Sequence, residues 1–146
     1  LYLIWIFCFT VAMGTMGYSL PAAIAAAMVD PDAIPIAIVG DGALQMTLGE
    51  LATMQQMLPS RKIIIVVATN GVLGRVHFGW EGVEGTRVGI PKLKPLAEAF
   101  DGTYNCIAST ERSQIIAAVD EALDAKGLHI LEMLVDDFNA APMVGL

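Results

Sequence analysis

The sequence predicts an α/β domain built on a mainly parallel β-sheet. Short apolar runs rich in β-branched residues alternate with helix-like segments, which is typical of layered α/β domains. The runs are apolar throughout instead of alternating, which indicates a sheet covered on both faces. A chain of 146 residues can bury one core of this kind, so we take residues 1–146 as one domain.

Five segments are predicted to be strands and four to be helices. The strands are expected at residues 1–9, 34–39, 62–68, 103–108 and 129–135. The helices are expected at residues 19–29, 47–58, 92–100 and 110–125. Thr47 and Glu50 fit a capping box for the second helix, and Pro59 stops it. Residues 71–91 are rich in glycine without a clear period, which predicts a long loop.

Composition and charge exclude several classes of protein. Hydrophobic residues make up 55% of the chain, above the roughly 45–50% of ordinary globular proteins, which indicates a face buried against a partner. The net charge is −7 and the basic residues are scattered, so nucleic acid binding is not expected. The apolar opening is shorter than the roughly 20 residues of a membrane-spanning helix. We therefore expect a cytoplasmic protein.

Two strand ends carry the residues with the clearest chemical meaning. Asp41 lies between Gly40 and Gly42 where one apolar strand ends, and Asn70 follows the next strand along the chain. Parallel strands place their carboxyl ends at one edge of the sheet, where ligands bind, so Asp41 and Asn70 can converge. A carboxylate and an amide oxygen suit Mg²⁺, which takes its remaining ligands from carbonyls, waters and substrate phosphates. The pattern predicts a metal-held diphosphate.

Two other interpretations of these residues are possible. Gly40-Asp41-Gly42 begins a dinucleotide-binding signature, but Gln45 stands where the third glycine belongs. An ionised Asp41 beside a pyrophosphate would repel it unless a cation lay between them. Taken singly, the glycine–acid–glycine turn and Asn70 could each be an ordinary turn at a strand end. Their occurrence at two consecutive strand ends favours the metal site.

These segments resemble the pyrophosphate-binding domain of thiamine diphosphate enzymes of the acetolactate synthase, pyruvate oxidase and 2-keto acid decarboxylase group. The resemblance covers about residues 14–143 and includes four stretches in the same order. They are Gly14-Thr15-Met16-Gly17, Gly40-Asp41-Gly42, the segment 45–53 and Asn70-Gly71-Val72-Leu73-Gly74. The resemblance implies a three-layer α/β/α fold with a six-stranded, mainly parallel sheet.

The resemblance also implies a role for each matching residue. The side chains of Asp41 and Asn70 and the carbonyl of Val72 would bind Mg²⁺. Met16 would hold the cofactor bent, which brings its 4′-amino group next to the reactive C2 carbon. Without the resemblance, Met16 would be read as an adaptable filler in an apolar loop. The expected cofactor-binding residues are Gly14, Met16, Gly40, Asp41, Gly42, Ala43, Asn70, Val72, Leu73 and Gly74.

The chain lacks parts that such an enzyme needs. In the family, a glutamate from a separate pyrimidine-binding domain protonates the cofactor ring, and this sequence contains no such domain. We therefore expect a fragment or one subunit of a larger oligomeric enzyme, inactive without that partner. Arg75, His77, Phe78 and Trp80 could face a small 2-keto acid, although each could equally be a surface or packing residue. His129 is expected to be structural.

The expected function is half of an enzyme that decarboxylates or ligates 2-keto acids, with thiamine diphosphate and Mg²⁺ as cofactors. One alternative is a small subunit of a split sulfopyruvate or phosphonopyruvate decarboxylase. Another is a noncatalytic nucleotide-binding module that uses Gly40-Asp41-Gly42 without a metal.

Overall fold

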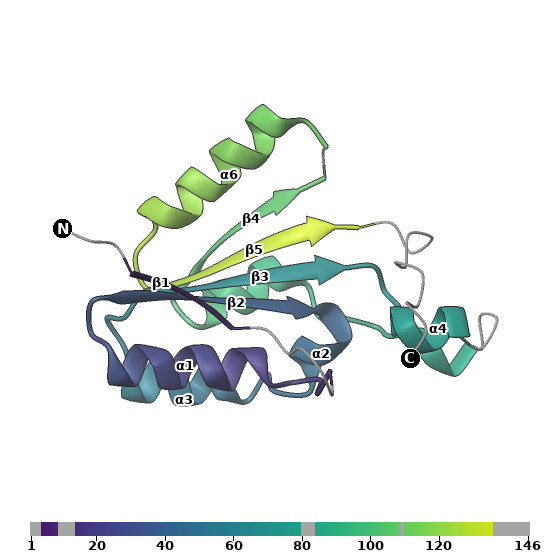
Figure 1. Ribbon diagram of the computed structural model, residues 1–146, viewed down its shortest axis with the longest axis horizontal. Coiled ribbons are helices and arrows are strands. Elements are labelled where there is room, and N and C mark those ends of the chain that lie inside the picture. The colour runs from purple at the N-terminus through teal and green to yellow at the C-terminus, as the bar shows by residue number, and fades with distance from the viewer. Residues whose placement is uncertain (1–3, 9–13, 80–83, 109, 136–146) are drawn as a thin grey trace.

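The computed structural model describes residues 4–8, 14–79, 84–108 and 110–135, which form an α/β domain around one all-parallel sheet (Figure 1). The strands are β1 (Ile4–Cys8), β2 (Ala33–Gly40), β3 (Ile63–Thr69), β4 (Thr103–Ile107) and β5 (Leu128–Leu134). Their order is β1-β2-β3-β5-β4, so β1 adds an edge strand to four strands flanked by helices. The five predicted strands are confirmed. A sixth strand is not seen among the described residues.

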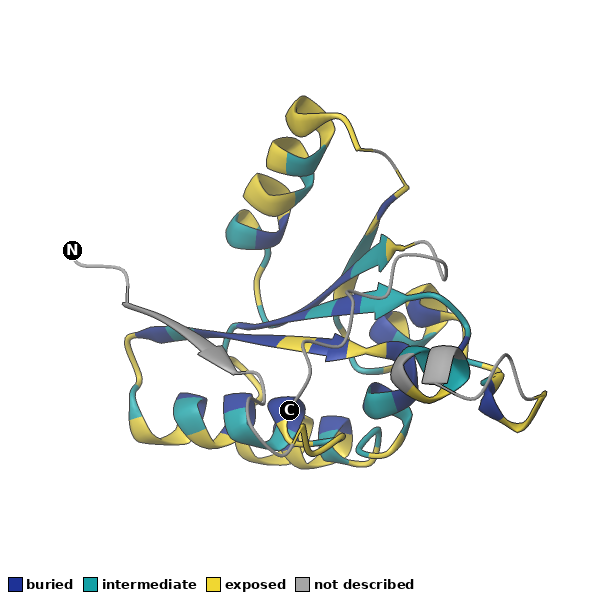
Figure 2. Ribbon diagram, turned by 45° about the vertical axis from the view of Figure 1, so that its right-hand side comes forward, coloured by how far each residue is buried: buried dark blue, intermediate teal, exposed yellow. Residues whose placement is uncertain are grey.

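Helices cover the two faces of the sheet unequally (Figures 1 and 2). The helices α1 (Ser19–Val29), α3 (Glu50–Met57) and α5 (Leu93–Ala99) share one apolar core with β2, β3 and β5. On the other face, α6 (Arg112–Asp124) buries only Ala122, beside Ile36 and Ile64. No helix in the described part of the chain is long and apolar enough to cross a bilayer.

The structure corrects the prediction for residues 47–58. The helix begins at Glu50, after an N-cap at Gly49 that makes no side-chain hydrogen bond, so the capping box is wrong. The reason is that Thr47 belongs to the turn after the preceding helix, where its N–H donates to the Leu44 carbonyl (3.0 Å). Its hydroxyl has no partner among the described groups, and its carbonyl, not its side chain, accepts the Glu50 N–H (2.9 Å).

Three short helices were not predicted. The first, α2 (Asp41–Gln45), follows β2 directly. The predicted loop at residues 71–91 contains α4 (Gly74–Gly79) and the 3-10 helix η1 (Glu84–Thr86). All three begin at or near the carboxyl edge of β2 and β3, where the register pairs Gly40 with Ala68. The residues after these two strands are therefore neighbours in space.

Candidate functional site

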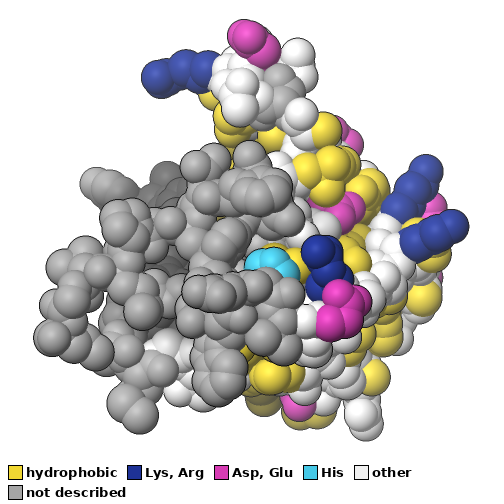
Figure 3. Space-filling view, turned by 90° about the vertical axis from the view of Figure 1, so that its right-hand side faces the viewer, with side chains coloured by type: hydrophobic (Ala, Val, Ile, Leu, Met, Phe, Trp, Pro, Cys, Tyr) yellow, Lys and Arg dark blue, Asp and Glu magenta, His cyan; other side chains and the backbone are white. Residues whose placement is uncertain are grey.

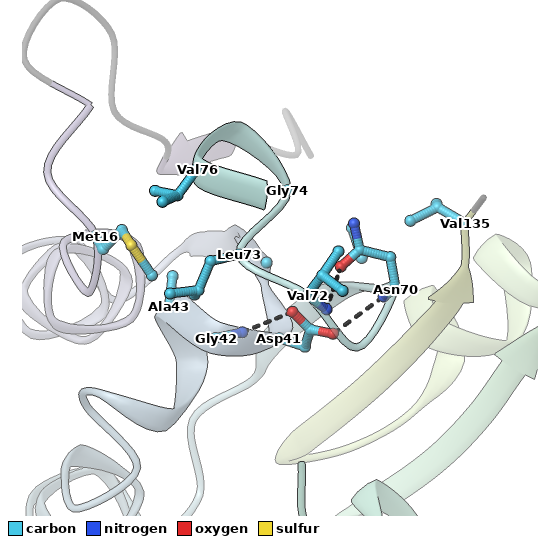
Figure 4. Close-up of a pocket in the computed structure, with 12 residues that line it drawn as sticks. Met16, Asp41, Gly42, Ala43, Asn70, Val72, Leu73, Gly74, Val76 and Val135 are labelled. Carbon is cyan, nitrogen blue, oxygen red and sulfur yellow. Dashed lines mark hydrogen bonds between the residues drawn. The ribbon is translucent and has the colours of Figure 1, made fainter. Parts of the chain in front are cut away.

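Asp41 is a buried carboxylate held by backbone N–H groups. It is only 4% exposed. Its Oδ1 accepts a hydrogen bond from Gly42 N (2.7 Å), and its Oδ2 accepts one from Asn70 N (3.0 Å) (Figure 4). Oδ2 also accepts a hydrogen bond from Gly71 N (2.7 Å). No described basic side chain forms an ion pair with it. Because an ionised carboxylate offers about four acceptor positions, these three bonds leave one position open.

Asn70 lies directly beside Asp41 at the end of β3 (Figure 4). Its side-chain Oδ1 accepts a hydrogen bond from Val72 N (3.1 Å). An amide oxygen has two lone pairs, so Asn70 also keeps one acceptor position open. The structure therefore brings together the two side chains that the sequence placed at consecutive strand ends.

The carbonyl of Val72 supplies a third oxygen. The segment after η1 runs antiparallel to the loop 71–73, with Leu73 N donating to Thr86 O (2.7 Å) and Val88 N donating to Gly71 O (2.9 Å). Val72 and Arg87 face each other between these two bonds. In such a pair the central residue directs its own N–H and C=O away from the partner segment. No described group donates to the Val72 carbonyl, which is free to bind a cation.

A cavity of about 300 Å³ adjoins these oxygens. A second cavity of about 180 Å³, which Gly14 lines, shares Met16, Gly40 and Ala43 with it. The larger cavity is lined by nine predicted residues, Met16, Gly40, Asp41, Gly42, Ala43, Asn70, Val72, Leu73 and Gly74, and by Ala68, Val76 and Val135, which were not predicted.

Three glycines shape the loop after β3 and its contact with the start of α2. A Cβ added to Gly42 would lie 2.6 Å from Leu73 Cδ2, far inside van der Waals contact. A Cβ on Gly74 would lie 3.3 Å from Asn70 Nδ2. Gly71 has φ +72°, a conformation that residues with a side chain rarely adopt. The cavity wall therefore depends on the absence of side chains at these positions.

Among the predicted substrate residues, only His77 has a side chain in the described part of the structure. His77 is half-buried, and its Nδ1 lies within hydrogen-bonding distance of Thr86 Oγ1 instead of lining the cavity. Arg75 and Phe78 belong to α4, but their side chains lie outside the described part of the structure, as does the whole of Trp80. Val76 contributes to the cavity wall because it lies one helical turn after Leu73.

The donor set fits a hard cation. No group of three or more His, Cys, Asp or Glu residues that could bind a metal occurs among the described residues. One carboxylate, one amide oxygen and one carbonyl instead suit Mg²⁺, which keeps waters and phosphate oxygens in its other positions. On the face seen in Figure 3, Lys and Arg side chains are dispersed among acidic ones and form no continuous patch.

These features define an α/β domain in which an acid, an amide and glycines lie beside a cavity at the carboxyl edge of the sheet. Residues 5–133 match the family described as "Thiamine pyrophosphate enzyme, C-terminal TPP binding domain". The chain belongs to this family, as the sequence motifs predicted.

Acetolactate synthases are among its relatives. The chain is 35% identical to the acetolactate synthase large subunit of Pyropia yezoensis, with 90% of this chain and 23% of that protein aligned. It is 32% identical to the isozyme 2 large subunit of Escherichia coli (strain K12), with 90% and 25% aligned. A probable large subunit from Methanocaldococcus jannaschii is also 32% identical, with 90% and 23% aligned. The chain thus spans about a quarter of the length of these relatives.

Proposed function

We propose that this chain binds the diphosphate of thiamine diphosphate through Mg²⁺, as half of an enzyme that decarboxylates or ligates 2-keto acids. The observation that carries the proposal is the set of three oxygens at the ends of β2 and β3, from Asp41, Asn70 and Val72, each with an open acceptor position beside one cavity. This proposal goes beyond family membership because it names a metal, the residues that bind the metal and a class of reaction.

Each part of the cavity has a separate task in this proposal. Asp41 and Asn70 bind the cation, while the three backbone N–H groups on Asp41 hold the carboxylate in a fixed orientation. Gly42 lets Leu73, and with it the loop after β3, lie close to the start of α2 beside the cavity that would take the diphosphate. Gly14 and Met16 extend the site into the second cavity, toward the pyrimidine ring.

The bound cofactor would supply a carbon nucleophile that attacks the keto group of the substrate. Activation of that carbon needs a glutamate from a pyrimidine-binding domain, which this chain does not supply. Large apolar side chains beside the cavities are exposed, including Met16 (40%), Val76 (45%) and Val135 (40%). Such an apolar rim suits a face that another domain covers.

Calorimetry with thiamine diphosphate and NAD, each with and without Mg²⁺, tests the cofactor assignment. We expect thiamine diphosphate to bind only when Mg²⁺ is present, and NAD not to bind. Because the partner domain supplies part of the site, the titration is repeated with a pyrimidine-binding domain added in trans. Tight NAD binding that does not depend on Mg²⁺ would favour the nucleotide-binding alternative and refute the proposal.

The reaction is tested by measuring carbon dioxide release from pyruvate and other 2-keto acids with the partner domain present. We expect release that requires both chains, thiamine diphosphate and Mg²⁺. Release from sulfopyruvate or phosphonopyruvate, but not from pyruvate, would replace the acetolactate synthase-like assignment with the split decarboxylase.

A further inference from the structure

Thr86 lines neither cavity, but it is buried beside the loop that carries Val72. It is 5% exposed and ends the short helix η1, and it contacts the loop 71–73 through one atom and α4 through another. Its carbonyl accepts the hydrogen bond from Leu73 N (2.7 Å), and its hydroxyl lies within hydrogen-bonding distance of His77 Nδ1 on α4. One buried residue thus joins the loop that carries Val72 to the helix that follows it.

The hydrogen bonds of the loop 71–73 fix the direction in which its peptide groups point. Residues 71 and 73 are both bonded to the segment 86–88, and this leaves Val72 with its carbonyl on the opposite side. On that side Val72 N bonds to Asn70 Oδ1 (3.1 Å), next to the Asp41 carboxylate. The position of Thr86 therefore determines which way the Val72 carbonyl points.

The start of α4 reinforces this orientation. Val76 N (2.9 Å) and His77 N (2.8 Å) both donate to the Leu73 carbonyl, so α4 begins directly on the loop. The contact between His77 and the Thr86 hydroxyl closes a ring that runs through Leu73, α4 and η1. Rotation of the Val72 peptide would break the ring at Leu73.

We propose that Thr86 is a positioning residue for the metal site: through Leu73 and His77 it holds the Val72 carbonyl toward the cation. This inference rests on the proposed Mg²⁺-dependent binding of thiamine diphosphate. Thr86 touches neither the metal nor the cofactor, and acts by reducing the freedom of a ligand that does. Preorganisation of this kind raises affinity because less order has to be created on binding.

The test uses Thr86→Val, which removes the hydroxyl and keeps the side-chain shape, and Thr86→Ser, which keeps the hydroxyl. The exposed Thr53 in α3 gives the matched control, Thr53→Val. Mg²⁺ is titrated at saturating thiamine diphosphate with the partner domain present. Thr86→Val should raise the Mg²⁺ concentration at half-saturation about tenfold, as for other residues that orient metal ligands. Thr86→Ser and Thr53→Val should stay within about twofold.

A second measurement separates positioning from general stability. Hydrogen exchange at Leu73 N–H and Val88 N–H, without cofactor, should speed up in Thr86→Val, while exchange in the β2 and β3 strands should not change. If Thr86→Val binds Mg²⁺ as the unmodified chain does, or if exchange rises equally throughout the domain, the positioning role is refuted and the proposed function stands. If the unmodified chain with its partner binds no thiamine diphosphate at any Mg²⁺ concentration, both proposals fail.

Discussion

Asp41, directly after β2, and His129, in β5, are both buried polar residues, but their surroundings differ. Asp41 is bonded by backbone N–H groups and keeps an acceptor position open beside a cavity. His129 is 0% exposed and has both ring nitrogens engaged, Nδ1 with Thr103 Oγ1 (2.8 Å) and Nε2 with Asn105 Oδ1 (3.0 Å). Burial alone therefore does not identify a binding site. What distinguishes Asp41 from His129 is an open acceptor position beside a cavity.

The hydrogen bonds around His129 form a closed structural network. Asn105 Nδ2 donates to Ala118 O (3.1 Å) and Glu121 Oε2 (3.0 Å) on α6, so its Oδ1 accepts from His129 Nε2–H. The other ring nitrogen, Nδ1, then accepts from the Thr103 hydroxyl. The network ties α6 to β4 and β5, where α6 has few buried apolar residues. His129 is structural, as the sequence suggested.

The largest expected effect is that of Asp41→Asn, which removes the charge and preserves the shape. We expect affinity for thiamine diphosphate with Mg²⁺ to fall roughly 100-fold or more, because an amide is a poorer cation ligand than a carboxylate. The titration is repeated with the control Asp32→Asn, since Asp32 is exposed and lies on the loop before β2. If Asp41→Asn binds thiamine diphosphate as tightly as the unmodified chain does, the open acceptor position that distinguishes Asp41 from His129 has no role in binding.

Gly42→Ala should have the next largest effect. The new methyl group would lie 2.6 Å from Leu73 Cδ2, so the loop 71–73 must move. Overpacking of this kind costs about 1–3 kcal/mol, which corresponds to roughly 5- to 150-fold in cofactor affinity if the loop moves into the cavity.

Gly49→Ala is the matched control for this change, because a Cβ at Gly49 meets no atom within 4 Å. We expect it to bind the cofactor as the unmodified chain does. The double variant Gly42→Ala/Leu73→Ala relieves the contact and should recover part of the affinity. If Gly42→Ala and Gly49→Ala weakened cofactor binding equally, the effect could not come from the contact between residue 42 and Leu73.

The sequence predicted the neighbouring positions of Asp41 and Asn70 better than it predicted the structure of the loop that follows Asn70. The neighbouring positions of Asp41 and Asn70 follow from apolar runs that end at consecutive strand ends, a pattern that is local and strong. The orientation of Val72 depends on Thr86 and Val88, more than a dozen residues further along, and no local signal indicates that pairing. The glycines that suggested a loop instead allow α4 to begin close to Asn70.

The pH dependence of stability tests the closed network. Burial lowers the pKa of His129 from its ordinary 6.5, a nearby Glu121 partly opposes this, and Lys62 lowers it further. The unfolded chain therefore binds more protons at this residue than the folded chain does. Its contribution to stability is complete above pH 6.5 and is lost as the pH falls through the lower pKa of the folded state.

Denaturant unfolding between pH 7.5 and pH 5 measures this effect (the range spans the ordinary pKa of histidine, about 6.5). His129→Gln should remove much of the fall in the free energy of unfolding across this range. Cofactor affinity at pH 7.5 should not change in His129→Gln. A change in affinity there would show that the network around His129 is linked to the site after all.

Tyr104→Phe should have the smallest effect. Tyr104 Oη donates to Glu132 Oε2 (2.6 Å), and burial together with this bond raises the pKa of the phenol above its ordinary 10.0. Loss of one half-buried hydrogen bond should lower the free energy of unfolding by about 0.5–1 kcal/mol. Because a raised pKa stabilises the protonated fold, the difference between the two proteins should persist up to pH 10 and shrink only above it. Thiamine diphosphate affinity should stay within about twofold, since the bond faces neither cavity of the candidate site.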